Sequence, residues 1–240
     1  MRQIKLMQKQ IQWIMLLLLL SASVFAAENH KISTPMEIND LNKFRLSHAK
    51  ELLGTSYKHS TVKSAESFNS IYEQVYTTTH RYLPKTFKHQ YKKIAQVIID
   101  SSIKNELDPV FVMAIIMSES SFDPKKVGSV GEIGLMQIRP ETAAWLAKKF
   151  KLPWKGAKTL RDPVANIRIG TTYLAHLRKR FDSHAQLYIA AYNMGQGNVQ
   201  RKLAEDVWPK IYPRKVMENY VAFYKDFVTA HNKDLIAQNN

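Results

Sequence analysis

The sequence contains no cysteine in its 240 residues. A disulfide framework, a thiolate metal site, a cysteine nucleophile and a lipid-modified N-terminal cysteine are therefore excluded. The eight histidines are scattered, and no two of them stand at a metal-binding spacing such as H-E-x-x-H. We therefore expect the protein to use neither a metal ion nor a cofactor, and to have no lipid anchor.

Acidic residues are few relative to basic ones. The 20 Asp and Glu are outnumbered by 35 Lys and Arg, which gives a formal net charge of +15. This surplus suits a polyanionic partner: nucleic acid, an anionic membrane surface or an acidic cell-wall polymer. The basic residues form short runs on separate predicted helices, which indicates solvated faces rather than one cationic membrane-binding helix. These runs are Lys148-Lys149, Arg178-Lys179-Arg180 and Arg201-Lys202.

No apolar run reaches the ~20 residues that a membrane-spanning helix needs. The run 13–20 instead follows a basic stretch and precedes Val-Phe-Ala at 24–26, which is typical of an export signal cleaved after Ala26. The alternative is an uncleaved anchor over residues 11–27. Cleavage lowers the net charge to +12, and export argues against a nucleic-acid partner. We expect a periplasmic protein that meets the membrane only through its transient signal peptide.

Strand signals are missing too, since no alternating pattern of useful length and no internal repeat is present. Apolar residues recur at helical spacing instead, so we predict an all-α fold. After the signal peptide (1–26) comes a polar, partly helical N-terminal extension (27–85), with a short helix expected around residues 68–76. A compact helical domain (86–230) follows, and residues 231–240 form a C-terminal tail.

Two Asp-Pro pairs predict where helices begin, because Asp caps a helix and Pro fits its first turn. Asp108-Pro109 precedes the apolar run 111–117, which is compatible with a buried helix or a buried strand, and the Asp-Pro start favours a helix. Asp162-Pro163 precedes an apolar stripe that includes Gly170, so we expect a neighbouring helix to approach closely there. A last amphipathic helix is expected over 216–227.

Glu119 lies near the end of the first of these helices. Val112, Ile115 and Ile116 precede it by seven, four and three positions, so the carboxylate falls on an apolar face. A carboxyl in apolar surroundings tends to keep its proton, which suits a general acid. The alternative is a carboxylate at a helix end that points to solvent, and periodicity alone does not separate the two.

Two further segments contain glycines near functional residue types. In the loop 128–134, glycines at every third position permit tight turns and close approach of a ligand, although a purely structural loop fits equally well. It lacks the Gly-Lys-Ser/Thr ending of a phosphate loop. In the second segment, Tyr192 and Asn193 stand just before Gly195, where they can also simply end a helix.

Together these segments resemble the signature of SLT-type lytic transglycosylases. The match consists of Glu119-Ser-Ser-Phe-Asp-Pro, Gly131, Gly134-Leu-Met-Gln-Ile, Pro140, Thr142-Ala143, Asn166-Ile167, Gly170, Tyr173-Leu174 and Ala191-Tyr192-Asn193-x-Gly195, within residues 92–228. The resemblance implies a lysozyme-like helical fold with a groove for a peptidoglycan glycan strand. It also implies cleavage of the β-1,4 bond between N-acetylmuramic acid and N-acetylglucosamine without water as the nucleophile.

The resemblance further implies roles for individual residues. Glu119 matches the catalytic glutamate, and the expected substrate-binding residues are Gly134, Met136, Gln137, Tyr192 and Asn193. The chain departs from the family where Gly128 and Glu132 replace a usual Ser and Ala, and where Lys126 replaces an Ala. Tyr212 matches a family Tyr near the C-terminus, but Trp208 stands where the family has a Glu.

The expected reaction uses Glu119 first as acid and then as base, which leaves 1,6-anhydromuramic ends. Ordinary glycosidases need two carboxylates, whereas the motif segments supply one convincing catalytic carboxylate. Nearby Asp123, Glu132 and Glu141 are expected to be dispensable. Two alternatives are a goose-type muramidase that admits water, and a non-catalytic peptidoglycan-binding module of a cell-envelope machinery.

Overall fold

The computed structural model describes residues 35–67 and 71–238. The expected signal peptide and its cleavage site lie outside these residues. The chain divides into two compact units, Met1–Asn39 and Asp40–Asn240. Of the first unit, the described part is the start of one helix, so the account below concerns the second. Among the described residues, no helix is both long and apolar enough to cross a membrane.

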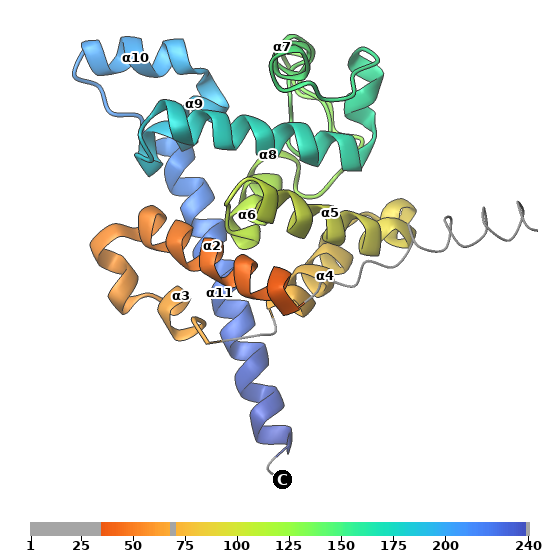
Figure 1. Ribbon diagram of the computed structural model, residues 1–240, viewed down its shortest axis with the longest axis vertical. Helices are drawn as coiled ribbons and strands as arrows, with labels where there is room; N and C mark the ends of the chain where they lie inside the picture. The colour runs from red at the N-terminus through yellow and green to blue at the C-terminus, as the bar shows by residue number, and fades with distance from the viewer. Residues whose placement is uncertain (1–34, 68–70, 239–240) are drawn as a thin grey trace, which may run out of the picture. The chain divides into compact units, whose positions relative to one another are not determined.

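The described residues form α-helices joined by loops and three short 3₁₀ turns (Figure 1). Over the described ranges the only β pairings are isolated bridges, Val127 to Ile133 and Ile133 to Ile138, which confirms the all-α prediction. The α-helices are α2 (Pro35–Leu53), α3 (Thr61–Ser64), α4 (Ile71–Tyr82), α5 (Tyr91–Lys104), α6 (Pro109–Ser120), α7 (Pro140–Phe150), α8 (Pro163–Arg180), α9 (Ala185–Met194), α10 (Gln196–Ala204) and α11 (Ile211–Gln238). The 3₁₀ turns are η1 (Gly54–His59), η2 (Lys85–Gln90) and η3 (Ala157–Arg161).

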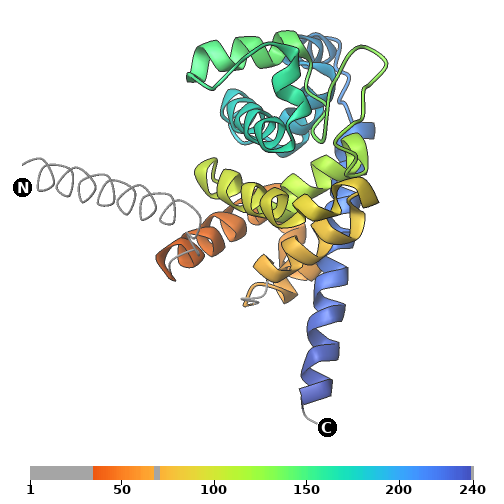
Figure 2. The same ribbon diagram turned by 90° about the vertical axis from the view of Figure 1, so that its right-hand side faces the viewer.

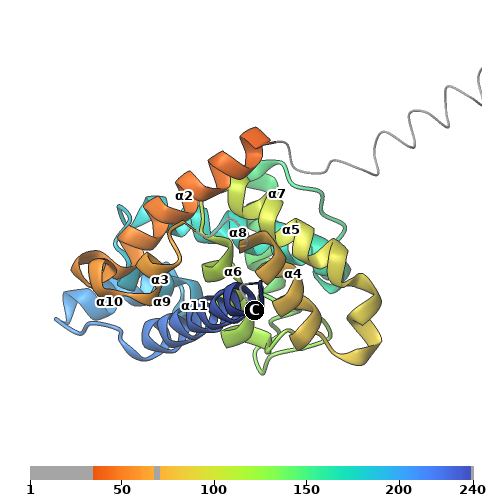
Figure 3. The same cartoon turned by 90° about the horizontal axis from the view of Figure 1, so that it is seen from below.

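Helix α6 is the buried centre of the unit. It begins as the Asp-Pro pair predicts, with Asp108 Oδ1 accepting a hydrogen bond from Val110 N at 2.8 Å. Residues 110–116 are all buried, which explains why this helix is apolar on every side. Helix α11 packs along it, as the view from below in Figure 3 shows, and α4 and α5 also contact it.

The N-terminal end of α6 is fixed by a buried polar network. The second oxygen of Asp108, Oδ2, accepts hydrogen bonds from the hydroxyls of Tyr220 (2.7 Å) and Tyr224 (2.8 Å) on α11. Arg45 on α2 is fully buried nearby and donates to Glu66 O at 2.9 Å. Its positive charge opposes the effect of burial, which raises the pKa of Asp108. The network joins α2, α6 and α11.

His48 extends this network to α9. Its Nδ1 accepts a hydrogen bond from Asp108 N at 3.0 Å, so the ring proton lies on Nε2, which donates to the Tyr188 hydroxyl at 2.9 Å. Burial, followed by the charge of Arg178, lowers the pKa of His48 well below its usual value. The ring is therefore a neutral structural connector, and helix α2 from Asp40 onward is part of the same packed unit.

Two helices and one close contact refine or correct the sequence expectations. Helix α4 occupies the place of the short helix expected around residues 68–76, and it continues to Tyr82. Helix α11 continues to Gln238, through most of the expected tail, and its C-terminal half projects past the neighbouring helices (Figure 2). The close approach at Gly170 is made by the loop residue Met136, not by a helix: a Cβ at Gly170 would lie 2.4 Å from Met136 Sδ.

Candidate active site

Glu119 is the penultimate residue of α6, and its carboxyl is only partly exposed. The helix ends at Ser121, whose backbone is left-handed (φ +53°). Ser120 Oγ donates to Leu135 O at 2.8 Å, which ties the helix end to the glycine loop. Burial raises the pKa of Glu119, and the hydrogen bond from Tyr212 and the charge of Lys215 oppose that rise. The carboxyl is thus suited to hold a proton.

Tyr212, in the first turn of α11, donates its hydroxyl hydrogen bond to Glu119 Oε1. Burial and the nearby carboxylate of Glu119 raise the pKa of Tyr212 well above its usual value, so the hydroxyl remains a donor. Lys215 and Asn219, which follow Tyr212 on α11, bind the same turn of α6. Lys215 Nζ donates to Ser118 O at 2.8 Å, and Asn219 Nδ2 donates to Ser118 Oγ at 2.9 Å.

Among the expected substrate-binding residues, Tyr192 and Gln137 hold the loop. The Tyr192 hydroxyl donates to Met136 O at 2.9 Å. Gln137 has a left-handed backbone (φ +46°), and its Nε2 donates to Gly134 O at 2.8 Å and to Lys126 O at 3.1 Å. Both side chains are therefore structural contacts in this state, and their contact with substrate stays a prediction.

Asn166 on α8 also binds the loop; this residue is part of the family resemblance but is not one of the expected substrate-binding residues. Its Oδ1 accepts from Met136 N at 2.8 Å, and its Nδ2 donates to Ile133 O at 2.8 Å. Gly134 lies against this amide with φ +82°, and a Cβ there would come within 2.4 Å of Asn166 Nδ2. Only glycine fits both the backbone and the space.

The expected site residues are thus divided by their exposure. Gly134, Met136, Gln137 and Tyr192 come together in a buried cluster between the loop and the C-terminal end of α9. Asn193, the residue after Tyr192, is exposed. Of these residues, Asn193 is therefore accessible to a glycan strand, whereas Met136 is fully buried.

Glu132 occupies the space that a side chain at position 128 would fill. A Cβ at Gly128 would lie 2.2 Å from Glu132 Oε2, which accepts a hydrogen bond from Val130 N at 3.2 Å. The two departures from the family pattern are therefore one structural unit, in which Gly128 makes room for the carboxylate of Glu132. The negative charge of Glu132 contributes to the raised pKa of Glu119.

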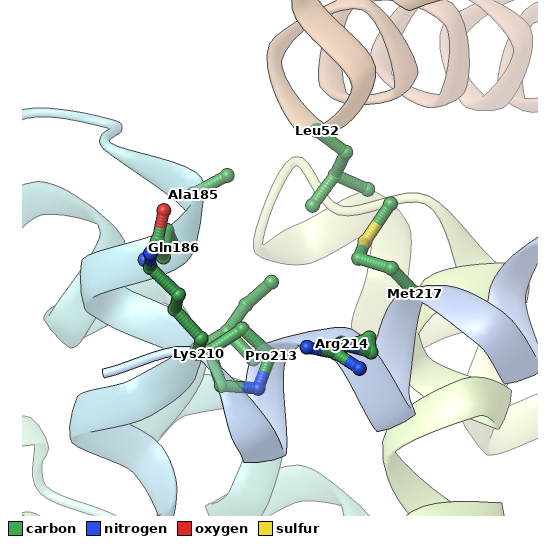
Figure 4. Close-up of a pocket in the computed structure, with 8 residues that line it drawn as sticks. Leu52, Ala185, Gln186, Lys210, Pro213, Arg214 and Met217 are labelled. Carbon is green, nitrogen blue, oxygen red and sulfur yellow. The ribbon is translucent and has the colours of Figure 1, made fainter. Parts of the chain in front are cut away.

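Two cavities in the structure do not include Glu119 in their lining. One, of about 300 Å³, lies between Leu52, the start of α9 and the first turns of α11, with Lys210 and Arg214 at its edge (Figure 4). A larger cleft lies between α5, α7 and α8. Within the described part of the chain no three His, Asp or Glu side chains cluster as metal ligands. The glycan-binding groove stays a prediction.

Comparison with known proteins supports the resemblance to SLT-type lytic transglycosylases. Residues 96–214 match the family model described as the transglycosylase SLT domain. This segment is similar to the SLT transglycosylases. The chain is 40% identical over 96 residues to the soluble lytic murein transglycosylase of Salmonella typhimurium, and 32% identical over 143 residues to the membrane-bound lytic murein transglycosylase C of Photorhabdus laumondii. These matches cover 40% and 55% of the chain, but only 15% and 40% of the relatives.

Solved structures of SLT transglycosylases show the same fold. The lytic transglycosylase Slt of Pseudomonas aeruginosa matches with a TM-score of 0.50 and 30% identity, over 56% of this chain and 24% of that one. The 70-kDa soluble lytic transglycosylase of Escherichia coli matches with a TM-score of 0.50 and 27% identity, over 70% of this chain and 31% of that one. The resemblance to the family and the lysozyme-like fold are confirmed.

Proposed function

We propose that the protein is a peptidoglycan lytic transglycosylase that cleaves the β-1,4 bond between N-acetylmuramic acid and N-acetylglucosamine. The observation that carries the proposal is the environment of Glu119, a partly buried carboxyl with a raised pKa at the end of a buried helix. The names of the relatives support murein as the substrate. The P. aeruginosa structure is that of an inactive glutamate-to-glutamine mutant, which fits a single essential glutamate in this family.

In the first step Glu119 gives its proton to the glycosidic oxygen, so that the bond to the muramic acid C1 breaks. The substrate's own 2-acetamido carbonyl can stabilise the positive charge at C1. Tyr212 donates to Glu119 Oε1, and this bond stabilises the carboxylate that remains. Because Tyr212 and Lys215 are fixed to α6, the carboxylate is held in one place while it changes its protonation state.

In the second step the Glu119 carboxylate takes the proton of the C6 hydroxyl of the same sugar, and the C6 oxygen closes onto C1. The product is a 1,6-anhydromuramic end, and the glutamate regains its proton. Attack within one molecule has a large entropic advantage over capture of a free water. The reaction needs no metal ion or cofactor, because one residue performs both proton transfers.

Glu132 favours one alternative function, a muramidase that admits water. A second carboxylate near Glu119 is what a hydrolytic glycosidase needs to activate a water molecule. Glu132 contributes to the charge around Glu119, and its position is set by Gly128. The transglycosylase is the better-supported function because a family match covers residues 96–214.

The two functions are distinguished by the mass of the muropeptides that the purified protein releases from sacculi. Anhydro ends lie one water below the hydrolysed form, and we expect the anhydro species to dominate. A digest that contains only reducing ends would move the protein to the muramidases, and a protein that binds sacculi but releases nothing would be a binding module of the cell envelope. We further propose that it acts in the periplasm, where its substrate lies, after loss of residues 1–26.

A further inference from the structure

The cleft between α5, α7 and α8 has a volume of about 730 Å³, which lies in the range of small-ligand sites. Two of the three basic runs in the sequence meet there, because α7 and α8 both end at its rim. Lys149 comes from the first run, and Lys179 and Arg180 come from the second. Lys104, at the end of α5, adds a fourth cation, and the one acidic side chain in the lining is Asp182.

These four cations are not neutralised by the protein. Across residues 35–67 and 71–238, no ion pair joins any of them to a carboxylate. The ammonium of Lys149 instead lies 4.9 Å from the ring centroid of Trp145. Burial, followed by the charges of Lys149 and Arg180, lowers the pKa of His176 in the cleft, so this ring stays neutral. With four cations and one carboxylate, Asp182, in its lining, the cleft has an excess of positive charge.

Phe150 lines this cleft, and Trp145 adjoins it through its contact with His176. The side chains of Trp145 and Phe150 are 41% and 39% exposed, and their rings lie 5.1 Å and 6.0 Å from that of His176. Large aromatic side chains that remain exposed in one cluster mark a binding surface more often than scattered ones do. A flat ring packs well against the C–H face of a sugar, and the adjacent cations suit carboxylates.

The cleft is separate from the catalytic glutamate. Lys104 comes shortly before Asp108, which caps the N-terminal end of α6, whereas Glu119 lies at the C-terminal end. At 1.5 Å per residue, the two ends of this helix are about 16 Å apart. A ligand in the cleft therefore does not occupy the position of the scissile bond, although one long polymer can reach both sites.

We propose that this cleft is a second binding site, which takes a carboxylate-bearing glycan strand, namely a peptidoglycan strand with its acidic peptide stems. The choice of polymer rests on the proposed function. Sugar rings pack on Trp145 and Phe150, and stem carboxylates pair with Lys149, Lys179 and Arg180. Because one strand can engage both sites, the second contact raises the time that the protein stays on the polymer.

The test uses the full chain with Glu119→Gln, so that the polymer is bound but not cut. Co-sedimentation measures the dissociation constant for purified sacculi and for chitin, which has similar sugars and no carboxylates. The double variant Lys179→Glu/Arg180→Glu reverses charge in the cleft. Lys92→Glu/Lys93→Glu is the matched control, with the same change of net charge on exposed residues at the start of α5. Thermal melting verifies that each variant is folded.

We expect the cleft variant to bind sacculi at least fivefold more weakly at low salt, and the control pair to change less than twofold. Trp145→Ala, which leaves the charge unchanged, should weaken binding at least threefold. Chitin should bind at least tenfold more weakly than sacculi. Equal losses in the two charge-reversal pairs would show a general charge effect, and no loss in the cleft variants, or tight binding of chitin, would overturn the site.

Failure of this inference is distinguishable from failure of the proposed function. The function fails if the unmodified protein releases no soluble fragments from sacculi, whatever the binding data show. The inference fails if the cleft variants bind sacculi as the control pair does, even when the unmodified protein cleaves normally.

Discussion

The two ends of helix α6 each hold a carboxyl whose pKa burial raises, yet the two groups are used differently. Asp108 at the N-terminal end is saturated with partners: Val110 N, two tyrosine hydroxyls and the nearby charge of Arg45. Glu119 at the C-terminal end has one side-chain donor, Tyr212, and remains partly exposed. The helix dipole also favours a negative charge at Asp108 and disfavours one at Glu119.

The comparison teaches that burial alone does not identify a catalytic carboxyl. Asp108 is enclosed and has no room for a substrate, so its hydrogen bonds serve the fold. Glu119 is partly exposed, so a substrate can approach its carboxyl, and fewer hydrogen bonds stabilise its negative charge. The same helix, α11, supplies the tyrosines at both ends, since Tyr212 contacts Glu119 and Tyr220 and Tyr224 contact Asp108. Substitutions at the two ends should therefore have opposite signatures.

The largest expected effect is on activity, from Glu119→Gln. The amide keeps the shape but cannot donate and accept the catalytic proton, so release of muropeptides should fall by about 10²–10⁴-fold or more. Because a raised pKa means that ionised Glu119 is a cost to the folded state at neutral pH, the melting temperature should be equal to that of the unmodified protein or higher. Turnover and thermal melting measure the two effects, and substantial remaining activity would contradict the assignment of Glu119.

Asp108→Asn should show the reverse pattern, with a large loss of stability. The amide has one acceptor oxygen, so it cannot accept from both tyrosine hydroxyls and also from Val110 N, and it leaves the buried Arg45 guanidinium without a nearby negative charge. Leaving groups of this buried network without a hydrogen-bond partner costs about 1–3 kcal/mol of unfolding free energy for each group. Denaturant titration measures it.

The matched control for Asp108→Asn removes both charges. If the unbalanced charge of Arg45 causes the loss, the double variant Asp108→Asn/Arg45→Met should lose less stability than the sum of the single variants. Simple additivity would show that the two tyrosine hydrogen bonds, rather than Arg45, account for the effect.

Tyr212→Phe sharpens the comparison on the catalytic side. Removing a hydrogen bond to a charged group costs about 1.5–3 kcal/mol, so turnover should fall roughly tenfold to a hundredfold. Because the Tyr212 hydrogen bond lowers the pKa of Glu119, its loss should move the alkaline limit of activity to higher pH. Tyr192→Phe is the control, since its hydroxyl contacts Met136 O and not Glu119. Equal effects of the two variants on the pH profile would argue against a direct role of Tyr212.

The smallest expected effect is that of Glu132→Gln, which should shift the alkaline limit of activity in the direction opposite to Tyr212→Phe. Removing this negative charge lowers the pKa of Glu119, which then loses its proton at a lower pH. The acid form is needed for the first step, so the alkaline limit of activity should move to lower pH, with less than about a threefold change at the optimum. Gly128→Ala, which displaces the Glu132 carboxylate, should move it in the same direction. A collapse of activity in Glu132→Gln would favour the muramidase.

Local signals in the sequence predicted much of this architecture. Asp108-Pro109 and Asp162-Pro163 begin α6 and α8 as expected, because a cap depends on neighbouring backbone groups alone. The Asp-Pro start before an unbroken apolar run favoured a buried helix that ends near Glu119, whereas the spacing of apolar residues left open whether the carboxyl points to solvent. The family motifs, which were read from short segments, led to the correct fold.

Contacts between distant segments were beyond the reach of local patterns. The tyrosine partners of Asp108 lie on α11, 112 and 116 residues further along the chain, and Tyr212 is 93 residues from Glu119. Nor did the sequence reveal that Gly170 accommodates a thioether, because a stripe of small and apolar residues predicts only close packing. Such pairings become visible only when the helices are assembled.

The tie between Arg45, Asp108 and the α11 tyrosines has a consequence for moving this domain between proteins. The segment that matches the family model, residues 96–214, includes Glu119 and Tyr212 but neither Arg45 nor Tyr220 and Tyr224. A chimaera that receives only this segment would inherit the catalytic motifs and a bare Asp108 carboxylate inside its new core. The recipient would have to supply a cation and two hydroxyls next to Asp108. The segment to transfer is therefore the larger one, from the helix of Arg45 to the helix of Tyr224.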